Sequence, residues 1–256
     1  MKKLFTGLLI LAFVSLNFAT LHAQETPQKP KYMVWEVQVN PIQLQKMQQA
    51  LKSQNAFLAE QNYPFANLTQ YTNDGYLWYS VPFTNYADID KIEATSQKLW
   101  KENGEKSKEL QALFEESFTS IAGLILELQP ELSIIPEQTS IRTGQKFRFF
   151  EQFHIKYGKE KEFEELVKQY ISLRKKHGIE NGFYTLYPVF APAMNVVYFI
   201  DETGSGAAEH FSENDKQWQM FGAEGEKLWN DVMPLIEKIV THLGAVDYDV
   251  SYVPNN

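Results

Sequence analysis

The chain has 256 residues, of which 44% are hydrophobic and 22% charged, with a formal net charge of -8 and no cysteine. These values suit one large or two smaller globular domains, and they exclude a disordered chain, collagen, a coiled-coil rod and a polytopic membrane protein. Without cysteine, the chain forms no disulfide, no thiolate nucleophile and no thiolate metal site.

The first 23 residues have the pattern of a secretory signal peptide. Two lysines precede an apolar run from Leu4 to Phe18, and small or polar residues lead to Ala23. We expect cleavage near Ala23, a flexible leader over 24–31 and an exported protein, periplasmic or extracellular, that leaves the membrane after cleavage. An uncleaved anchor is the alternative. Loss of the two lysines leaves a charge of -10, which repels phosphate backbones, so nucleic acid is not an expected partner.

The segment 32–140 predicts the element order β-α-β-β-α-β. Asn40-Pro41 supplies an N-cap and a first helical proline, and Asn73-Asp74-Gly75 is typical of a hairpin turn. A break is expected at Asn103-Gly104 within the second helical region. The predicted strands cover 32–39, 65–72, 76–81 and 131–135, and the second helical region carries an apolar stripe from Leu110 to Ile125.

The segment 141–256 predicts the same order again. A helix that ends at Gly178 follows the first strand, and Pro234 is expected to kink a long helical region that covers 207–243. The predicted strands are 146–155, 183–190, 195–200 and 246–253.

An internal repeat connects the two segments. At a shift of 118 residues, seven identical pairs fall at equivalent places: Lys98/Lys216, Trp100/Trp218, Gly104/Gly222, Leu110/Leu228, Ile121/Ile239, Ser133/Ser251 and Pro136/Pro254. The pattern predicts a duplication, with a first repeat over 32–140 and a second over 141–256. The two tryptophans are expected to pack helix on sheet, with ligand stacking as the alternative.

Two β-α-β-β-α-β units in one chain resemble the dimeric α+β barrel superfamily in its fused, tandem ferredoxin-like form. The resemblance implies an α+β fold in which two antiparallel sheets pack face to face and helices cover their outer faces. It also implies functions such as cofactor-free monooxygenases, haem enzymes of the chlorite-dismutase type, and binding or stress-related proteins. The family's catalytic motifs are not recognisable, so the catalytic residues are unknown and the resemblance transfers no site onto this chain.

Polar residues on the first strand of each repeat are the candidate ligand-binding groups. Gln152 and His154 share one strand face, and Glu36 and Gln38 share a face of the matching strand. His154 is a candidate base, hydrogen-bond donor or haem ligand. The alternative is a histidine that is exposed to solvent or hydrogen-bonded in the core. Glu36 and Gln38 are candidate groups for orienting a ligand. The alternative is that they lie at a solvated edge of the sheet. Glu151 lies at a place in its repeat similar to that of Glu36.

Aromatic residues on the central strands are expected to line a cavity between the sheets that suits a flat or hydrophobic ligand. The candidates are Tyr71, Trp78, Tyr184 and Tyr198. No metal site is predicted, because His210 with Glu213 and Asp215 is a weak arrangement at an exposed helix start.

Three functions compete. The first is binding of a small apolar or aromatic molecule between the sheets without catalysis, which needs only the aromatic surface. The second is an oxidoreductase of the cofactor-free monooxygenase or haem-dependent type; the sequence requires no cofactor, but haem is compatible with it. The third is a protein-interaction module. Because a fused pair closes a barrel within one chain, both a monomer and a homodimer remain open.

Overall fold

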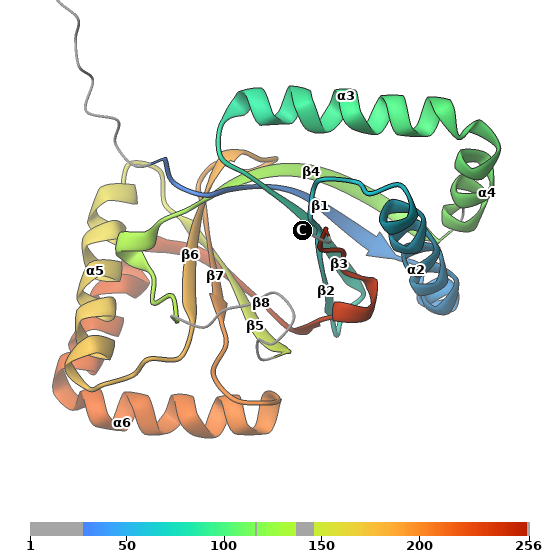
Figure 1. Ribbon diagram of the computed structural model, residues 1–256. Helices are drawn as coiled ribbons and strands as arrows, with labels where there is room; N and C mark the ends of the chain where they lie inside the picture. The colour runs from blue at the N-terminus through green and yellow to red at the C-terminus, as the bar shows by residue number, and fades with distance from the viewer. Residues whose placement is uncertain (1–27, 116, 137–145, 255–256) are drawn as a thin grey trace, which may run out of the picture.

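The computed structural model describes residues 28–115, 117–136 and 146–254. Eight strands in this part of the chain form a closed antiparallel barrel in the order β1-β3-β2-β8-β5-β7-β6-β4, in which β4 also pairs with β1 (Figure 1). The strands are β1 (Lys31–Val39), β2 (Leu68–Thr72), β3 (Tyr76–Phe83), β4 (Phe118–Leu128), β5 (Phe147–Ile155), β6 (Phe183–Phe190), β7 (Val196–Asp201) and β8 (Ile236–Val246).

Helices cover the outside of this barrel. Those of the second repeat lie on the left and at the bottom of Figure 1, and those of the first lie on the right and at the top. The α-helices are α2 (Leu44–Glu60), α3 (Tyr86–Glu102), α4 (Gly104–Phe114), α5 (Glu160–Lys176) and α6 (Ala207–Val232). Short 3₁₀ helices are η1 (Pro41–Gln43), η2 (Pro130–Leu132), η3 (Met233–Leu235) and η4 (Tyr248–Val250).

Local sequence signals determine several of these boundaries. The Asn40 side chain accepts a hydrogen bond from the Ile42 backbone N–H, which caps η1 ahead of α2. Gly75 has a φ of 91°, which glycine adopts without strain, and it completes the turn between β2 and β3. Asn103 ends α3 at the expected break. The equivalent break in α6 is at Gly222, whose φ is 52°.

The duplication is visible in the strand pairing. Each repeat contributes a four-stranded sheet, β4-β1-β3-β2 or β8-β5-β7-β6, and the sheets join where β2 pairs with β8 and β4 with β6. The strands β4 and β8 begin 118 positions apart, at Phe118 and Ile236. The sequence-based shift therefore describes a structural repeat.

The segment after the last strand of each repeat binds to the other repeat. Ser133, after β4, donates its hydroxyl to the Gln129 carbonyl (2.7 Å) and accepts from the Thr185 backbone N–H on β6 (3.0 Å). Ser251, after β8, does the same with the Asp247 carbonyl (2.7 Å) and the Thr69 backbone N–H on β2 (2.9 Å). These two exchanged contacts hold the repeats together in a nearly symmetric way.

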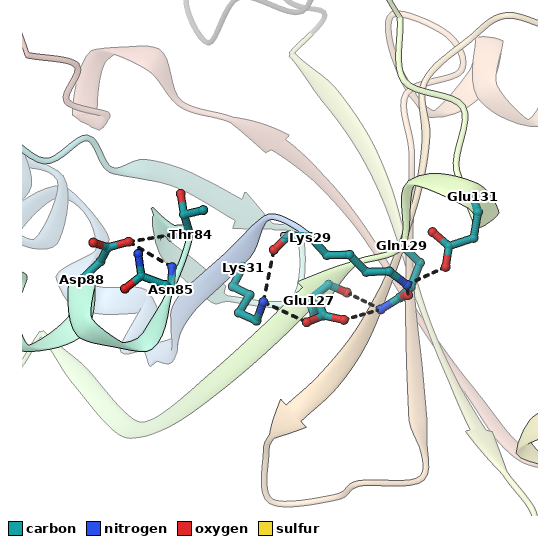
Figure 2. A network of polar contacts seen from close by, with 8 residues as sticks. All are labelled: Lys29, Lys31, Thr84, Asn85, Asp88, Glu127, Gln129 and Glu131. Atoms are coloured by element: carbon teal, nitrogen blue, oxygen red, sulfur yellow. Dashed lines mark hydrogen bonds and ion pairs between the residues drawn. The ribbon is translucent and has the colours of Figure 1, made fainter. Parts of the chain in front are cut away.

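A polar network anchors the start of β1 (Figure 2). The Lys29 Nζ atom contacts Gln129 and lies 2.5 Å from the Glu131 carboxylate, and the Lys31 Nζ atom lies 3.0 Å from Glu127 Oε2. Since Glu127 belongs to β4 and Glu131 to η2, the network ties the first described residues to the segment that crosses toward the second repeat.

Side chains from both repeats fill the inside of the barrel. Trp78 of β3 contacts Phe150 of β5 and Tyr198 of β7, with ring centroids 5.1 and 6.0 Å apart. The buried members of this cluster are Val34, Trp78, Leu124, Leu126, Leu128, Phe150, Leu186, Val196 and Tyr198. The face-to-face packing of the two sheets is thus confirmed, and aromatic side chains pack at its centre.

Two predicted helical regions were wrong at their ends. The stripe expected to extend to Ile125 stops at Phe114, and β4 follows; the region expected to reach residue 243 stops at Val232, and β8 follows. In place of the predicted closing strands at 131–135 and 246–253, the chain forms η2 and η4 with isolated bridges at Ile134 and Tyr252. Pro234 lies in η3 and ends the helix.

The predicted signal peptide and the boundary between the repeats, at residues 140 and 141, lie outside the described residues. Among the helices of the described part, none combines the length and the apolar character that crossing a membrane requires.

Candidate functional site

One cavity lies outside the barrel, between the sheet of the second repeat and its helices α5 and α6. Its volume is about 480 Å³. We call it the second-repeat cavity, and its lining residues are Phe149, Glu151, Phe153, Phe163, Leu166, Val167, Tyr170, Phe183, Phe199, Asp201, His210, Asn214, Trp218, Glu226, Leu228, Trp229 and Val232. Trp229 is 41% exposed and therefore lies at the mouth.

Aromatic rings that contact one another form the walls of this cavity. Phe199 packs edge-on against Phe153 and stacks on Phe183, with centroid distances of 5.1 and 5.2 Å. Tyr170 stacks on Trp218 at 6.2 Å. Rings fixed in this way give a preformed, largely apolar site that suits a flat ligand. The ring contacts of Trp218 therefore join α6 to α5, which differs from the predicted packing of helix on sheet, and Trp218 also lines the cavity.

Glu151 is the acid that projects into this aromatic space from β5. Its side chain is half-buried, and no residue of the described chain forms an ion pair with it. Burial raises the pKa of the Glu151 carboxyl to about 7, and the neighbouring charge of Asp201 adds to the shift. Near neutral pH the carboxyl can therefore both accept and donate a proton.

The negative charge of Asp201, at the end of β7, is compensated by a neighbouring cation, and that of Glu151 is not. Its Oδ2 atom accepts a hydrogen bond from Arg174 Nη1 (3.1 Å), and its Oδ1 atom accepts one from the Thr203 backbone N–H (2.6 Å). Arg174 is 0% exposed and also donates to the Asn181 carbonyl at 3.1 Å. The ion pair with Arg174 thus compensates the charge of Asp201, whereas no described residue forms an ion pair with Glu151.

His210, near the start of α6, is the second group with acid–base character in the lining. Its Nδ1 atom lies 3.1 Å from the Thr203 carbonyl oxygen, so a neutral ring donates from Nδ1 and carries its lone pair on Nε2. The Nε2 atom is buried without a partner among the described residues. The expectation of an exposed helix start was wrong, because His210 is 2% exposed and its ring lies 4.4 Å from that of Phe149.

A smaller cavity of about 100 Å³ occupies the equivalent place in the first repeat. We call it the first-repeat cavity, and its lining residues are Trp35, Gln54, Leu58, Tyr63, Phe65, Ala66, Tyr79, Val81, Ile92, Ser96 and Trp100.

The strand ladders match the positions of the two cavities. A bulge follows Gln38 in β1 and His154 in β5, so these strands correspond at an offset of 116. Trp35 pairs with Tyr79 across β1 and β3, as Glu151 pairs with Phe199 across β5 and β7. Glu151 therefore corresponds to Trp35 and not to Glu36, which corrects the similarity of place that the sequence indicated.

The charged and polar groups of the second-repeat site are replaced by apolar residues in the first repeat. The helices can be aligned between the repeats in the same way. Helices α2 and α5 both have 17 residues and are aligned end to end, and α3 is aligned with α6 by placing Trp100 on Trp218. The resulting pairs are Glu151 with Trp35, Asp201 with Val81, Arg174 with Leu58 and His210 with Ile92. Three of these residues, Glu151, Asp201 and His210, line the second-repeat cavity, and Arg174 pairs with Asp201 beside it, so the two cavities differ in charge.

The residues predicted from sequence lie elsewhere, and the structure brings only some of them together. Glu36 Oε2 accepts a hydrogen bond from Trp78 Nε1 (3.0 Å), and Trp78 contacts Tyr198 inside the barrel. Burial raises the pKa of Glu36, and it raises the pKa of Tyr198 to about 12. Tyr184 packs against the same cluster, and burial raises the pKa of its phenol.

The remaining predicted residues are dispersed. Gln152 pairs with Tyr198 in the β5–β7 ladder, Gln38 is exposed, and Tyr71 packs against a separate cluster on the outer side of the first repeat. His154 is half-buried; partial burial and the positive charge of Lys238 lower its pKa. None of these residues lines either cavity.

Neither His154 nor His210 is placed to hold haem in the two cavities. His154 borders neither cavity, and the Nε2 atom of His210 is covered by its surroundings. Neither imidazole thus presents an accessible nitrogen to a cavity, and we derive no step through haem.

Sequence reasoning missed Glu151, Asp201 and Arg174. Alternation along β5 placed Glu151 on the face opposite Gln152 and His154, as the structure has it, but the other face was chosen for the ligand.

Comparison with solved structures places the fold among known proteins. A candidate monooxygenase from Lactobacillus acidophilus matches with a TM-score of 0.54 and 8% identity, over 89% of this chain and 98% of that one. A candidate monooxygenase from Fusobacterium nucleatum matches at 0.55 with 11% identity, over 86% and 93%. An anthrone oxidase-like protein matches at 0.56 with 12% identity, over 86% and 92%.

No family model matches the sequence, and no curated protein matches it. The structural matches show that the chain has the dimeric α+β barrel fold, as the repeat pattern predicted.

Proposed function

We propose that the protein is an enzyme that binds a small planar aromatic molecule in the second-repeat cavity and uses Glu151 to remove a proton from it. The observation that carries the proposal is an unpaired carboxyl with a pKa of about 7 in an aromatic cavity. A general base is most effective when its pKa lies near the working pH, because it is then largely deprotonated and still basic enough to take the proton.

The reaction class that fits this site is cofactor-free oxidation of a ring methylene. Glu151 takes one proton from the CH₂ group, and the electron pair left on carbon delocalises into the flanking rings. Dioxygen is the oxidant: one oxygen atom becomes the new carbonyl oxygen and the other leaves as water, so CH₂ and O₂ give C=O and H₂O. The names of the structural neighbours, candidate monooxygenases and an anthrone oxidase-like protein, support this class.

Anthrone is the test substrate, because its methylene is acidic and flanked by two rings. We expect the wild-type protein to consume one O₂ per anthrone at pH 8, measured with an oxygen electrode and by quinone absorbance. The Glu151→Gln variant is expected to lose at least about 100-fold in kcat, while anthrone binding, followed by tryptophan fluorescence, is retained.

Glu36→Gln is the matched control, because Glu36 lies on the neighbouring position of the equivalent strand but faces the barrel interior. We expect its rate to equal that of the wild type. Loss of activity in Glu36→Gln with none in Glu151→Gln would place the site inside the barrel. Tight binding of anthrone by the wild type without oxygen consumption would contradict an enzyme and leave non-catalytic ligand binding.

Export is a further part of the proposal, supported by the pattern of the first 23 residues. We expect the protein from its own cells to start near Gln24 and to be found outside the cytoplasm. A cytoplasmic protein with an intact N-terminus would contradict export.

A further inference from the structure

The first-repeat cavity is a compartment that the proposed reaction does not use. It lies behind β1 and β3, under α2 and α3, and its volume is about 100 Å³. No residue among its described lining carries a charge. It differs in this from the second-repeat cavity, whose lining includes Glu151 and Asp201.

Aromatic contacts hold the walls of the first-repeat cavity in place. Trp35 packs edge-on against Tyr79, with ring centroids 5.8 Å apart, and Trp100 stacks on Phe57 at 5.4 Å. Tyr63 packs against Phe65 at 5.5 Å. Because each ring on the wall is held by a neighbour, the cavity cannot close by a simple rotation of one side chain.

The polar atoms at the cavity already have partners or stay neutral. The Tyr63 and Ser96 hydroxyls form a hydrogen bond with each other at 2.7 Å. Burial raises the pKa of the phenols of Tyr63 and Tyr79, so both remain protonated. A charged guest would lose its hydration without compensation, whereas an apolar guest would gain contacts.

We propose that the first-repeat cavity is a second ligand site, which takes one neutral apolar molecule the size of a single aromatic ring. A hydrophobic cavity of roughly 150 Å³ is known to hold one benzene or a xenon atom, and this cavity is of the same order. The site does not depend on the proposed chemistry at Glu151, because the two cavities share no lining residue.

The five tryptophans make the test specific. Trp35 and Trp100 line the first-repeat cavity, Trp218 and Trp229 line the second-repeat cavity, and Trp78 lies inside the barrel. We would titrate the protein with toluene and follow the five indole N–H signals by NMR. Saturable shifts of Trp35 and Trp100, with Trp78 unmoved, are the expected result.

Ala66→Leu fills the cavity and is expected to weaken these shifts by at least about ten-fold in apparent affinity. Val232→Phe, which narrows the other cavity, is the matched control and is expected to leave the Trp35 and Trp100 response unchanged. Signals of Trp35 and Trp100 that stay fixed up to the solubility limit of toluene would overturn the proposal, as would equal affinity in Ala66→Leu.

A crystal of the wild-type protein under xenon gas provides a readout that needs no variant. Xenon density between Trp35 and Trp100 is expected, and its absence would overturn the proposal. A failure of the wild type to oxidise anthrone would contradict the proposed enzyme and leave this site untouched, because the two cavities share no lining residue.

Discussion

The two repeats share a framework and differ in the chemistry of one cavity. Both repeats break their second helical region at equivalent places, at Asn103 just before Gly104 and at Gly222. Both also bind their final segment to the other repeat through a serine, Ser133 or Ser251. Charged groups line only the cavity of the second repeat among the described residues. The comparison teaches that a duplicated fold can keep its supporting contacts in both copies while charged groups line the cavity of one copy only.

The strongest way to break this comparison is to convert Arg174, the buried partner of Asp201, into its first-repeat equivalent. Arg174→Leu leaves the Asp201 carboxylate buried without its cation, and we expect a loss of about 3–5 kcal/mol in the free energy of unfolding, measured with urea. The double variant with Asp201→Val, which copies both first-repeat residues, is expected to lose less than the single variant. A double variant as unstable as the sum of the single losses would contradict the ion-pair account.

The pH dependence of stability sharpens the comparison at Glu151. Its pKa of about 7 lies above the ordinary value of 4.5, so the folded state binds the proton more tightly. This contribution to stability is fully present below pH 4.5 and is lost as pH rises through 7. Relative to Glu151→Gln, the wild type should lose roughly 3 kcal/mol between pH 4.5 and 8. Parallel stability curves for the two proteins would contradict the shift.

The smallest expected difference tests the shared framework. Ser133→Ala and Ser251→Ala each remove one hydroxyl that both donates to a carbonyl and accepts from a backbone N–H. Each change should cost about 1–2 kcal/mol, because a backbone donor loses its partner. Urea denaturation should give similar losses for both, and a large loss for one alone would show that the repeats are not fastened equivalently.

The sequence predicted the duplication and the fold because repeated residues retained their spacing, but it misplaced the last strand of each repeat. Phe118, Ile121, Leu124 and Ile125 match a helical period by position. The structure instead buries Leu124, Leu126 and Leu128, every second residue of a strand. Short apolar runs fit both periods, and only pairing with β1 decides between them. The error recurs in the second repeat because the repeats share the pattern.

The site was predicted less well because both faces of β5 carry a polar residue among aromatic ones. Alternation places Glu151 and Gln152 on opposite faces of β5. It does not tell which face borders the second-repeat cavity and which faces the packed interior of the barrel. That difference depends on how far α5 and α6 stand from the sheet, which is a property of tertiary packing. Arg174 and Asp201 come from elements distant in sequence, and no spacing rule connects them.

The protonation of Glu151 tests the central claim most directly. The protein would be labelled with ¹³C at glutamate carboxyls, and the Glu151 signal would be assigned by its absence in Glu151→Gln and followed from pH 3 to 10. A carboxyl that titrates near pH 7 and moves when anthrone is added is the predicted result. A carboxyl that titrates near its ordinary value of 4.5 and does not respond to anthrone would contradict a proton-accepting site in the second-repeat cavity.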